Sequence, residues 1–153
     1  MYRNESLKHF DKVKSIYILN ANYYNKITTD LMKSSVKILK KNKINISLLN
    51  VHGVLEIPIA IRKNIKKFDS FIAIGCVIKG QTPHFDLICN TVFESILNLS
   101  IKYNKPIGNG IITALNMKQA KQRSSLIKSV KPNKGFEAAM AVLSILNNFP
   151  KKI

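Results

Sequence analysis

The chain is poor in acidic residues, arginine and cysteine, and it has no long hydrophobic segment. Its 153 residues include 8 acidic and 25 basic side chains, and only Arg3, Arg62 and Arg123 among the latter are arginines. The net charge of +17 is therefore mostly lysine, spread along the chain without the interleaved aromatics that stack on bases. We expect no specific nucleic-acid partner, only weak nonspecific binding at low salt.

The two cysteines, Cys76 and Cys89, do not have the spacing of metal ligands. We expect them to be core thiols, with no disulfide and no metal site. No apolar run reaches the roughly twenty residues of a membrane span, and the first dozen residues lack the apolar stretch of a signal peptide. The sequence therefore predicts a cytoplasmic protein that has no membrane partner.

Alternating short apolar runs and helical periodicities predict one domain of the α/β class. Residues 1–14 are polar and aperiodic, so we expect a flexible N-terminal tail followed by a single domain over 15–150. Strands are expected at 15–19, 44–49, 70–78 and 107–113, with residues 51–56 as a loop. Helices are expected at about 27–39, 58–67, 83–103, 117–124 and from 134. This alternation predicts a three-layer α/β/α domain with a four-stranded parallel sheet.

The most informative segment is 71–90, where an apolar strand pattern breaks into a polar turn and resumes as a helix. The N–H groups at a helix start lack partners within the helix and lie at the positive end of its dipole. A turn of this kind favours binding of a small anion such as phosphate. Thr82 is expected to cap the helix, and Pro83 to occupy its first position.

Four segments resemble the lumazine synthases, the penultimate enzymes of riboflavin biosynthesis. The strand, turn and helix start from Gly75 to Asp86 is similar to the family signature. The other three agree in order and spacing: Gly-Val-Leu-Glu-Ile-Pro from Gly53, Gln119-Ala120 followed by Arg123, and Asn-Lys-Gly-Phe-Glu-Ala-Ala from Asn133. The resemblance covers residues 15–148 and implies a flavodoxin-like strand order, which alternation alone leaves open.

The resemblance also implies a reaction. Lumazine synthases are transferases that condense 5-amino-6-(D-ribitylamino)uracil with 3,4-dihydroxy-2-butanone 4-phosphate, through an imine, phosphate elimination and ring closure. The product is 6,7-dimethyl-8-ribityllumazine, and phosphate and water are released. No cofactor is implied, and the sequence has no dinucleotide-binding fingerprint.

Two residues would carry the central roles if the resemblance holds. His84 matches the proposed proton-transfer residue, since imidazole is suited to moving protons near pH 7. Arg123 matches the phosphate anchor, since a guanidinium can bind phosphate through two hydrogen bonds. Gln81 and Thr82 would add donors to the same phosphate. The alternatives are that His84 and Arg123 are merely exposed helix residues.

The remaining matched positions would bind the pyrimidine and its ribityl chain. Tyr23 would stack on the ring, unless it packs in the core instead. Glu56 would bind ribityl hydroxyls, with backbone contacts from Val54 and Leu55. Lys134 would contact the uracil from a neighbouring subunit, or else lie in solvent. The resemblance also assigns the strand end to the substrate site: Cys76, Val77 and Ile78.

Several positions depart from the family pattern. Asn109 stands where several members have a phenylalanine that covers the ribityl pocket, and Leu55 replaces another phenylalanine. Lys79 replaces a frequent arginine, and Tyr24 replaces a common asparagine. His52 stands where many members have a proline, and we interpret it as a supporting or surface residue. These changes leave two interpretations open: an enzyme of weaker substrate affinity, or a catalytically weak paralogue that binds flavin or a ribityl-pyrimidine.

The family resemblance implies a homopentamer whose sites lie between subunits. Each site would take one set of residues from one subunit, namely Tyr23, Glu56, Gln81, Thr82 and His84. The neighbour would supply Asn109, Arg123 and Lys134. An icosahedral 60-mer is possible in the family, but the segment 124–132 is longer than in shell-forming members and favours a pentamer.

Overall fold

The fold is built on four parallel strands in the order β2-β1-β3-β4. The computed structural model describes residues 14–127 and 132–146. Its strands are β1 (Ser15–Ala21), β2 (Asn45–Val51), β3 (Ser70–Ile78) and β4 (Ile107–Ala114). β1 pairs with β2 on one side and β3 on the other, and β4 pairs with β3. This order confirms the flavodoxin-like parallel sheet.

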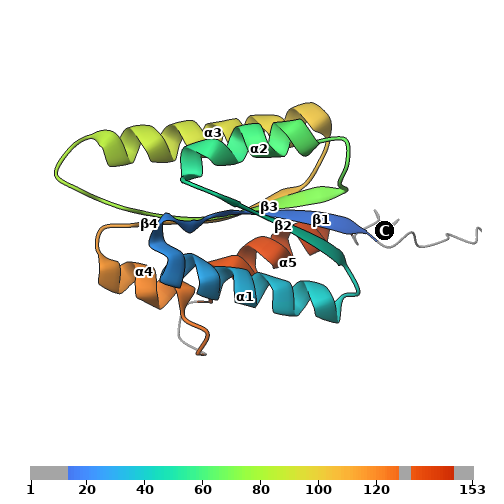
Figure 1. Cartoon of the computed structure of the whole chain (residues 1–153), viewed down its shortest axis with the longest axis horizontal. Helices are drawn as coiled ribbons and strands as arrows, with labels where there is room; N and C mark the ends of the chain where they lie inside the picture. Colours follow the sequence, from blue (N-terminus) through green and yellow to red (C-terminus); the bar gives the residue numbers. More distant parts are fainter. Residues whose placement is uncertain (1–13, 128–131, 147–153) are drawn as a thin grey trace, which may run out of the picture.

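Helices cover both faces of the sheet, as Figure 1 shows. One face carries α1 (Asn25–Lys41), α4 (Met117–Ser124) and α5 (Lys134–Leu146), and the other carries α2 (Ile57–Asn64) and α3 (His84–Tyr103). Two single 3₁₀ turns, η1 (Asn22–Tyr24) and η2 (Val54–Glu56), follow β1 and β2. The predicted three-layer α/β/α architecture is therefore confirmed. The parts of the tail and domain predictions that concern 1–13 and 147–150 lie outside the described residues.

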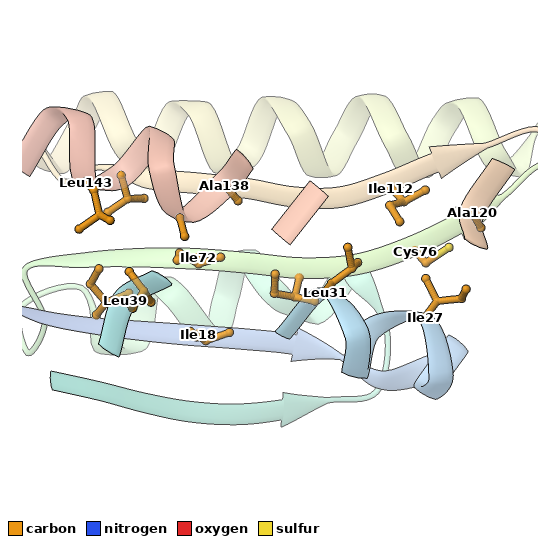
Figure 2. Close-up of a cluster of buried hydrophobic side chains, with 14 of the residues drawn as sticks. Ile18, Ile27, Leu31, Leu39, Ile72, Cys76, Ile112, Ala120, Ala138 and Leu143 are labelled. Carbon is orange, nitrogen blue, oxygen red and sulfur yellow. The ribbon is translucent and has the colours of Figure 1, made fainter. Parts of the chain in front are cut away.

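Each face of the sheet has its own apolar cluster. The cluster under α1 and α5, drawn in Figure 2, includes Ile18, Ile72, Leu31, Leu39 and Leu143. The cluster under α2 and α3 is built around Phe71. β3 contributes to both and is buried from Ser70 to Cys76, which explains its uninterrupted apolar sequence. In the part of the chain that the structure describes, no helix is long and apolar enough to cross a membrane.

Two glycines allow neighbouring elements to pack in close contact, η2 on β3 and α5 on α1. A Cβ atom on Gly75 would lie 2.6 Å from Cγ1 of Val54, so glycine at this point of β3 lets η2 pack directly on the strand. A Cβ atom on Gly135 would lie 2.1 Å from the carbonyl oxygen of Leu31 in α1. The Ser35 hydroxyl donates a 2.7 Å hydrogen bond to the Gly135 carbonyl. These contacts fix the start of α5 against α1.

Several sequence-based boundaries were wrong by a few residues. Residue 51 was expected in a loop, but Val51 belongs to β2 because it is paired with Ala21 of β1. The helix predicted to reach residue 67 ends at Asn64. Pairing between strands, which a local pattern does not contain, decides the end of β2, whereas the residues after Asn64 form turns closed by the bonds from the Ile65 N–H to Arg62 and from the Lys67 N–H to Asn64.

The predicted cap of α3 was also wrong. Pro83, not Thr82, is the N-cap residue, and no side chain caps this helix. The N–H groups of Asp86 and Leu87 both donate to the Pro83 carbonyl, at 3.1 and 3.3 Å. The turn thus closes on a backbone oxygen, and the Thr82 hydroxyl is not needed for it.

Replacing Gly135 by alanine tests the close packing of α5 on α1. We expect Gly135→Ala to lower the free energy of unfolding by about 3 kcal/mol, because the new methyl group meets backbone that cannot move aside. Gly80→Ala is the matched control, since a Cβ atom there meets nothing within 4 Å. Its effect should stay within about 0.5 kcal/mol. Urea denaturation followed by circular dichroism measures both, and equal stability of the two variants would contradict the packing argument.

Candidate active site

A pocket of about 400 Å³ lies at the carboxyl ends of β1, β2 and β3. The chain leaves β1 through α1 on one face of the sheet and leaves β2 through α2 on the other. Ligands of open parallel sheets bind at such a switch point. The residues that line the pocket are Ala21, Tyr23, Tyr24, His52, Gly53, Val54, Leu55, Glu56, Cys76, Val77, Ile78, His84 and Ile88.

The loop after β2 presents Leu55 and Glu56 to this pocket. Val54 is 8% exposed and anchors η2 in the core, while both following side chains are exposed. Oε2 of Glu56 accepts a 2.7 Å hydrogen bond from the Gly53 N–H and so holds the turn closed. No hydrogen bond uses Oε1 of Glu56 within the described segments. The carboxylate is therefore oriented by the backbone and retains acceptor capacity for hydroxyl groups.

Two tyrosines from η1 form an aromatic corner of the pocket. Their rings meet edge to face, with centroids 5.0 Å apart and an interplanar angle of 79°. Tyr24 packs against the core, and burial together with the nearby Tyr23 and Cys76 raises its pKa. Tyr23 is 72% exposed. Tyr23 is thus not a core residue of the single chain, and its ring face is accessible to a flat ligand.

Cys76 forms part of the pocket wall as a neutral thiol. Its side chain is 5% exposed and belongs to the core cluster under α1, which confirms the expected core thiol. Burial raises the pKa of Cys76 to about 12. The same expectation was wrong for Cys89, which is half-buried and belongs to neither apolar cluster; burial and the nearby Asp86 carboxylate raise its pKa. Cys76 is therefore a packing group at neutral pH and not a nucleophile.

The turn between β3 and α3 has unused hydrogen-bond donors. Gln81, Thr82 and Pro83 are exposed and do not line the pocket, whereas His84, the first residue of α3, does. The backbone N–H groups of Thr82, His84 and Phe85 have no acceptor in the described parts of the chain. Free donors at a helix N-terminus, beside an imidazole, suit an anionic group close to a proton-transfer centre.

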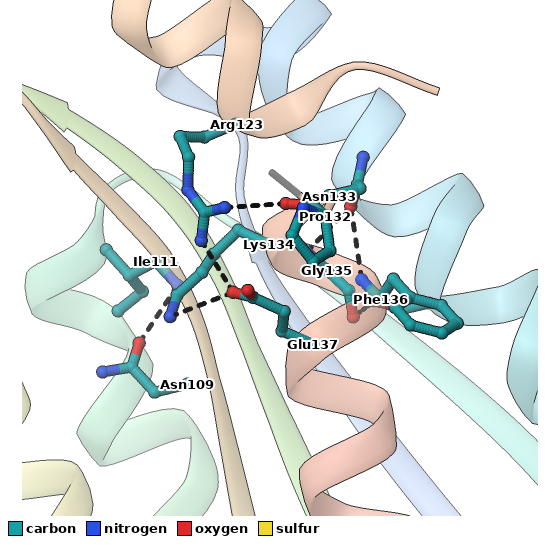
Figure 3. A network of polar contacts seen from close by, with 10 residues as sticks. Asn109, Ile111, Arg123, Pro132, Asn133, Lys134, Gly135, Phe136 and Glu137 are labelled. Carbon is teal, nitrogen blue, oxygen red and sulfur yellow. Dashed lines mark hydrogen bonds and ion pairs between the residues drawn. The ribbon is translucent and has the colours of Figure 1, made fainter. Parts of the chain in front are cut away.

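A second group of predicted residues lies where α4 meets α5 (Figure 3). Nη1 of Arg123 donates to the Pro132 carbonyl at 2.8 Å, and Nη2 lies 2.7 Å from Oε2 of Glu137. Nζ of Lys134 lies 3.5 Å from the same Glu137 oxygen. The three side chains are 24 to 35% exposed. Arg123 and Lys134 are thus brought together, with one carboxylate between them.

Asn133 organises this second group, a role that was not predicted from the sequence. Its side-chain N–H₂ donates to the Ser124 carbonyl at 2.6 Å and the Ser125 carbonyl at 3.3 Å. Its Oδ1 accepts from the N–H groups of Gly135 and Phe136, at 2.8 and 3.2 Å. Asn133 therefore caps α5 and ties it to the end of α4. Asparagine immediately before a helix pattern was the available signal.

Asn109 lies apart from the pocket, on the edge strand β4. Its Oδ1 accepts a 3.0 Å hydrogen bond from the Ile111 N–H, and the residue is half-buried. Neither Asn109 nor Arg123 nor Lys134 lines the 400 Å³ pocket. One chain thus carries two separate groups of predicted residues. Tyr23, Glu56 and His84 of the first expected set line the pocket, whereas Gln81 and Thr82 of that set lie in the adjoining turn.

The fold and the pocket define a class of protein: a three-layer parallel α/β protein with a candidate small-molecule site at the switch point of its sheet. The pocket is mostly apolar with a few polar groups, as small-molecule sites usually are. Across 14–127 and 132–146, no three His, Cys, Asp or Glu side chains are grouped so that they could hold a metal ion.

Comparison with known proteins identifies the family. A sequence model of the 6,7-dimethyl-8-ribityllumazine synthase family matches residues 14–149. A protein of that name from Bartonella tribocorum is 33% identical over 94% of this chain and 97% of its own length. The protein of that name from Campylobacter curvus is 36% identical over 88% of this chain and 87% of its own length. The one from Bartonella henselae is 38% identical over 86% of this chain and 85% of its own length. The chain belongs to the 6,7-dimethyl-8-ribityllumazine synthase family, and the resemblance found from the motifs is confirmed.

The buried thiol of Cys76 yields a labelling prediction. With a pKa of about 12, about one Cys76 in ten thousand is ionised at pH 8, so iodoacetamide should modify it far more slowly than Cys89. In urea both cysteines should react at similar rates. Peptide mass spectrometry after timed labelling measures the two sites separately. Equal labelling in the native protein would mean that Cys76 is not protected by the core.

Proposed function

We propose that this chain catalyses the reaction of its family, the condensation of 5-amino-6-(D-ribitylamino)uracil with 3,4-dihydroxy-2-butanone 4-phosphate to 6,7-dimethyl-8-ribityllumazine. The observation that carries the proposal is the meeting of His84, Tyr23 and Glu56 in one pocket, although they come from three separate elements, α3, η1 and η2. Family membership assigns the chain to the transferases of riboflavin biosynthesis.

The pyrimidine substrate fits the aromatic and acidic parts of the pocket. Tyr23 offers an exposed ring face for the heterocycle, and the oriented Glu56 carboxylate accepts hydrogen bonds from ribityl hydroxyls. The backbone of Val54 and Leu55 lies beside that carboxylate. The strand end from Cys76 to Ile78 forms an apolar wall that excludes water from the reacting groups.

The phosphate substrate fits the N-terminus of α3. Gln81 and Thr82 lie in the turn, where the free N–H groups can donate hydrogen bonds to the phosphate oxygens, and Arg123 of a neighbouring subunit would neutralise the anion. His84, at the same helix start, is then within reach of the reacting carbons. We assign to His84 the proton transfers of imine formation, phosphate elimination and ring closure.

The alternative of a catalytically weak paralogue is not favoured, because the relatives compared are named as lumazine synthases and match nearly the whole chain. The departures at Leu55 and Asn109 concern the cover of the ribityl chain, not the proposed proton-transfer residue.

We propose that the protein is located in the cytoplasm, because the sequence has no apolar run of membrane-spanning length and its first dozen residues lack the apolar stretch of a signal peptide. Cell fractionation would test it.

Two substitutions test the assignment of roles. His84→Ala should lower kcat about a hundredfold while the fold is retained, because the proton-transfer group is lost. Arg123→Ala should chiefly raise the KM of the butanone phosphate, about thirtyfold, because a charge-assisted pair with phosphate is lost. Lumazine formation is followed by absorbance. His52→Ala, another histidine of the same pocket, is the comparison and should have a much smaller effect.

We further propose a homopentamer in which each site is completed by the adjacent subunit. The proposal is supported by the separation of the pocket residues from Arg123, Lys134 and Asn109 within one chain. Five chains of 17.3 kDa give about 87 kDa, which native mass spectrometry would distinguish from the icosahedral 60-mer. A ring of identical head-to-tail contacts is the assembly that brings the two groups together.

Mixed assemblies test this division of the site. At butanone phosphate concentrations well below the wild-type KM, co-expressed His84→Ala and Arg123→Ala subunits should regain about a quarter of wild-type activity. With random mixing, that is the share of interfaces at which an intact His84 meets an intact Arg123. Each variant assembled alone should remain impaired. Activity of the mixture no higher than the mean of the two variants would place both residues in the same subunit's site.

A further inference from the structure

The inference concerns Glu137, the carboxylate between Arg123 and Lys134 (Figure 3). We propose that Glu137 is a positioning residue, which fixes the guanidinium of Arg123 and the amine of Lys134 relative to each other. It thereby couples the phosphate part of the site to the pyrimidine part. This inference rests on the proposed function, in which Arg123 binds the phosphate, and on the role that the family resemblance implies for Lys134, contact with the uracil.

One oxygen atom makes both contacts. Oε2 of Glu137 lies 2.7 Å from Nη2 of Arg123 and 3.5 Å from Nζ of Lys134. Arg123 comes from the last turn of α4, whereas Lys134 and Glu137 are three residues apart in the first turn of α5. A shared acceptor means that displacement of one cation changes the surroundings of the other.

The other contacts in this network restrict the positions that the Arg123 side chain can take. Its Nη1 is held by the Pro132 carbonyl at 2.8 Å, and Asn133 fixes the adjoining start of α5. No other carboxylate lies within ion-pair distance of Arg123 or Lys134 among the described residues. Two of the five guanidinium N–H donors are used here, so others remain for an anion. The Arg123 side chain is thus held in place while some of its N–H donors remain free to bind an anion.

Glu137 also offsets the repulsion between the two cations. Like charges close together disfavour each other, and partial burial strengthens this effect. Without the carboxylate, Lys134 would lose its only ion-pair partner within the described chain and turn toward solvent. Arg123 would keep its bond to Pro132 and lose its second point of attachment. Loss of Glu137 should therefore weaken the binding of both substrates, whereas loss of either cation should weaken chiefly the binding of one.

Two variants of Glu137 separate these contributions. Glu137→Ala removes both contacts and should raise the KM of each substrate about tenfold, with kcat changed less than threefold. Glu137→Gln keeps an acceptor of the same length for Arg123 but no charge for Lys134. It should raise the KM of the pyrimidine about fivefold and that of the butanone phosphate less. Glu94→Gln, on the exposed side of α3, is the control and should match wild type.

Double-variant cycles distinguish positioning from a general loss of structure. Combining Glu137→Ala with Arg123→Ala should add little to the KM of the butanone phosphate. Combining Glu137→Ala with Lys134→Ala should add little to the KM of the pyrimidine. Fully additive effects in both cycles, or unchanged KM values in folded Glu137→Ala assemblies, would overturn the inference. Native mass spectrometry and the thermal unfolding midpoint establish that the assemblies compared are intact.

A binding measurement keeps the inference separate from the proposed activity. Calorimetric titration with inorganic phosphate needs no turnover, and Glu137→Ala should bind phosphate about tenfold more weakly than the wild-type assembly. If the wild-type protein forms no lumazine, the proposed function fails and this titration alone decides the role of Glu137. Equal phosphate affinity of wild type and variant, or no binding by either, would overturn it.

Discussion

Burial of β3 on both faces is the constraint on which the rest of the structure depends. A strand with apolar side chains on both sides must be covered by two layers, so α1 and α5 pack on one face while α2 and α3 pack on the other. The carboxyl end of the same strand provides Cys76, Val77 and Ile78 as a wall of the pocket. The chain that follows forms the turn with free N–H groups and His84. The core and the candidate site are thus consecutive parts of one segment.

The second half of the site depends on a different device, a polar junction between α4 and α5. Asn133 joins the two helices through four hydrogen bonds, and Gly135 lets α5 contact α1 directly. Arg123 and Lys134 receive their positions from this junction and from Glu137. These residues stand away from the pocket of their own chain, which supports the proposal that assembly completes the site.

Much of this could be predicted from the sequence. The apolar run of β3 and the periodicities of α3 and α5 are local signals, and the four motifs in register indicate the family from the sequence alone. The roles missed at Asn133 and Glu137 also had local signals, a cap residue before a helix and an acid three positions after a lysine. The errors at Val51 and Thr82 are of another kind. Strand pairing decides that Val51 belongs to β2, and a backbone carbonyl closes the turn at the start of α3. Neither interaction can be recognised in the local sequence pattern.

By itself the sequence determined the class of fold, the positions of most elements and the identity of the chemical groups, because periodicity, turn residues and motif spacing are properties of neighbouring residues. The tertiary structure alone decided which of those groups meet. It brought Tyr23, Glu56 and His84 into one pocket and kept Arg123 and Lys134 outside it, bound to Glu137. The physical reason is that strand order and helix packing depend on contacts between distant residues, whose energies are realised only when both faces of the sheet are covered.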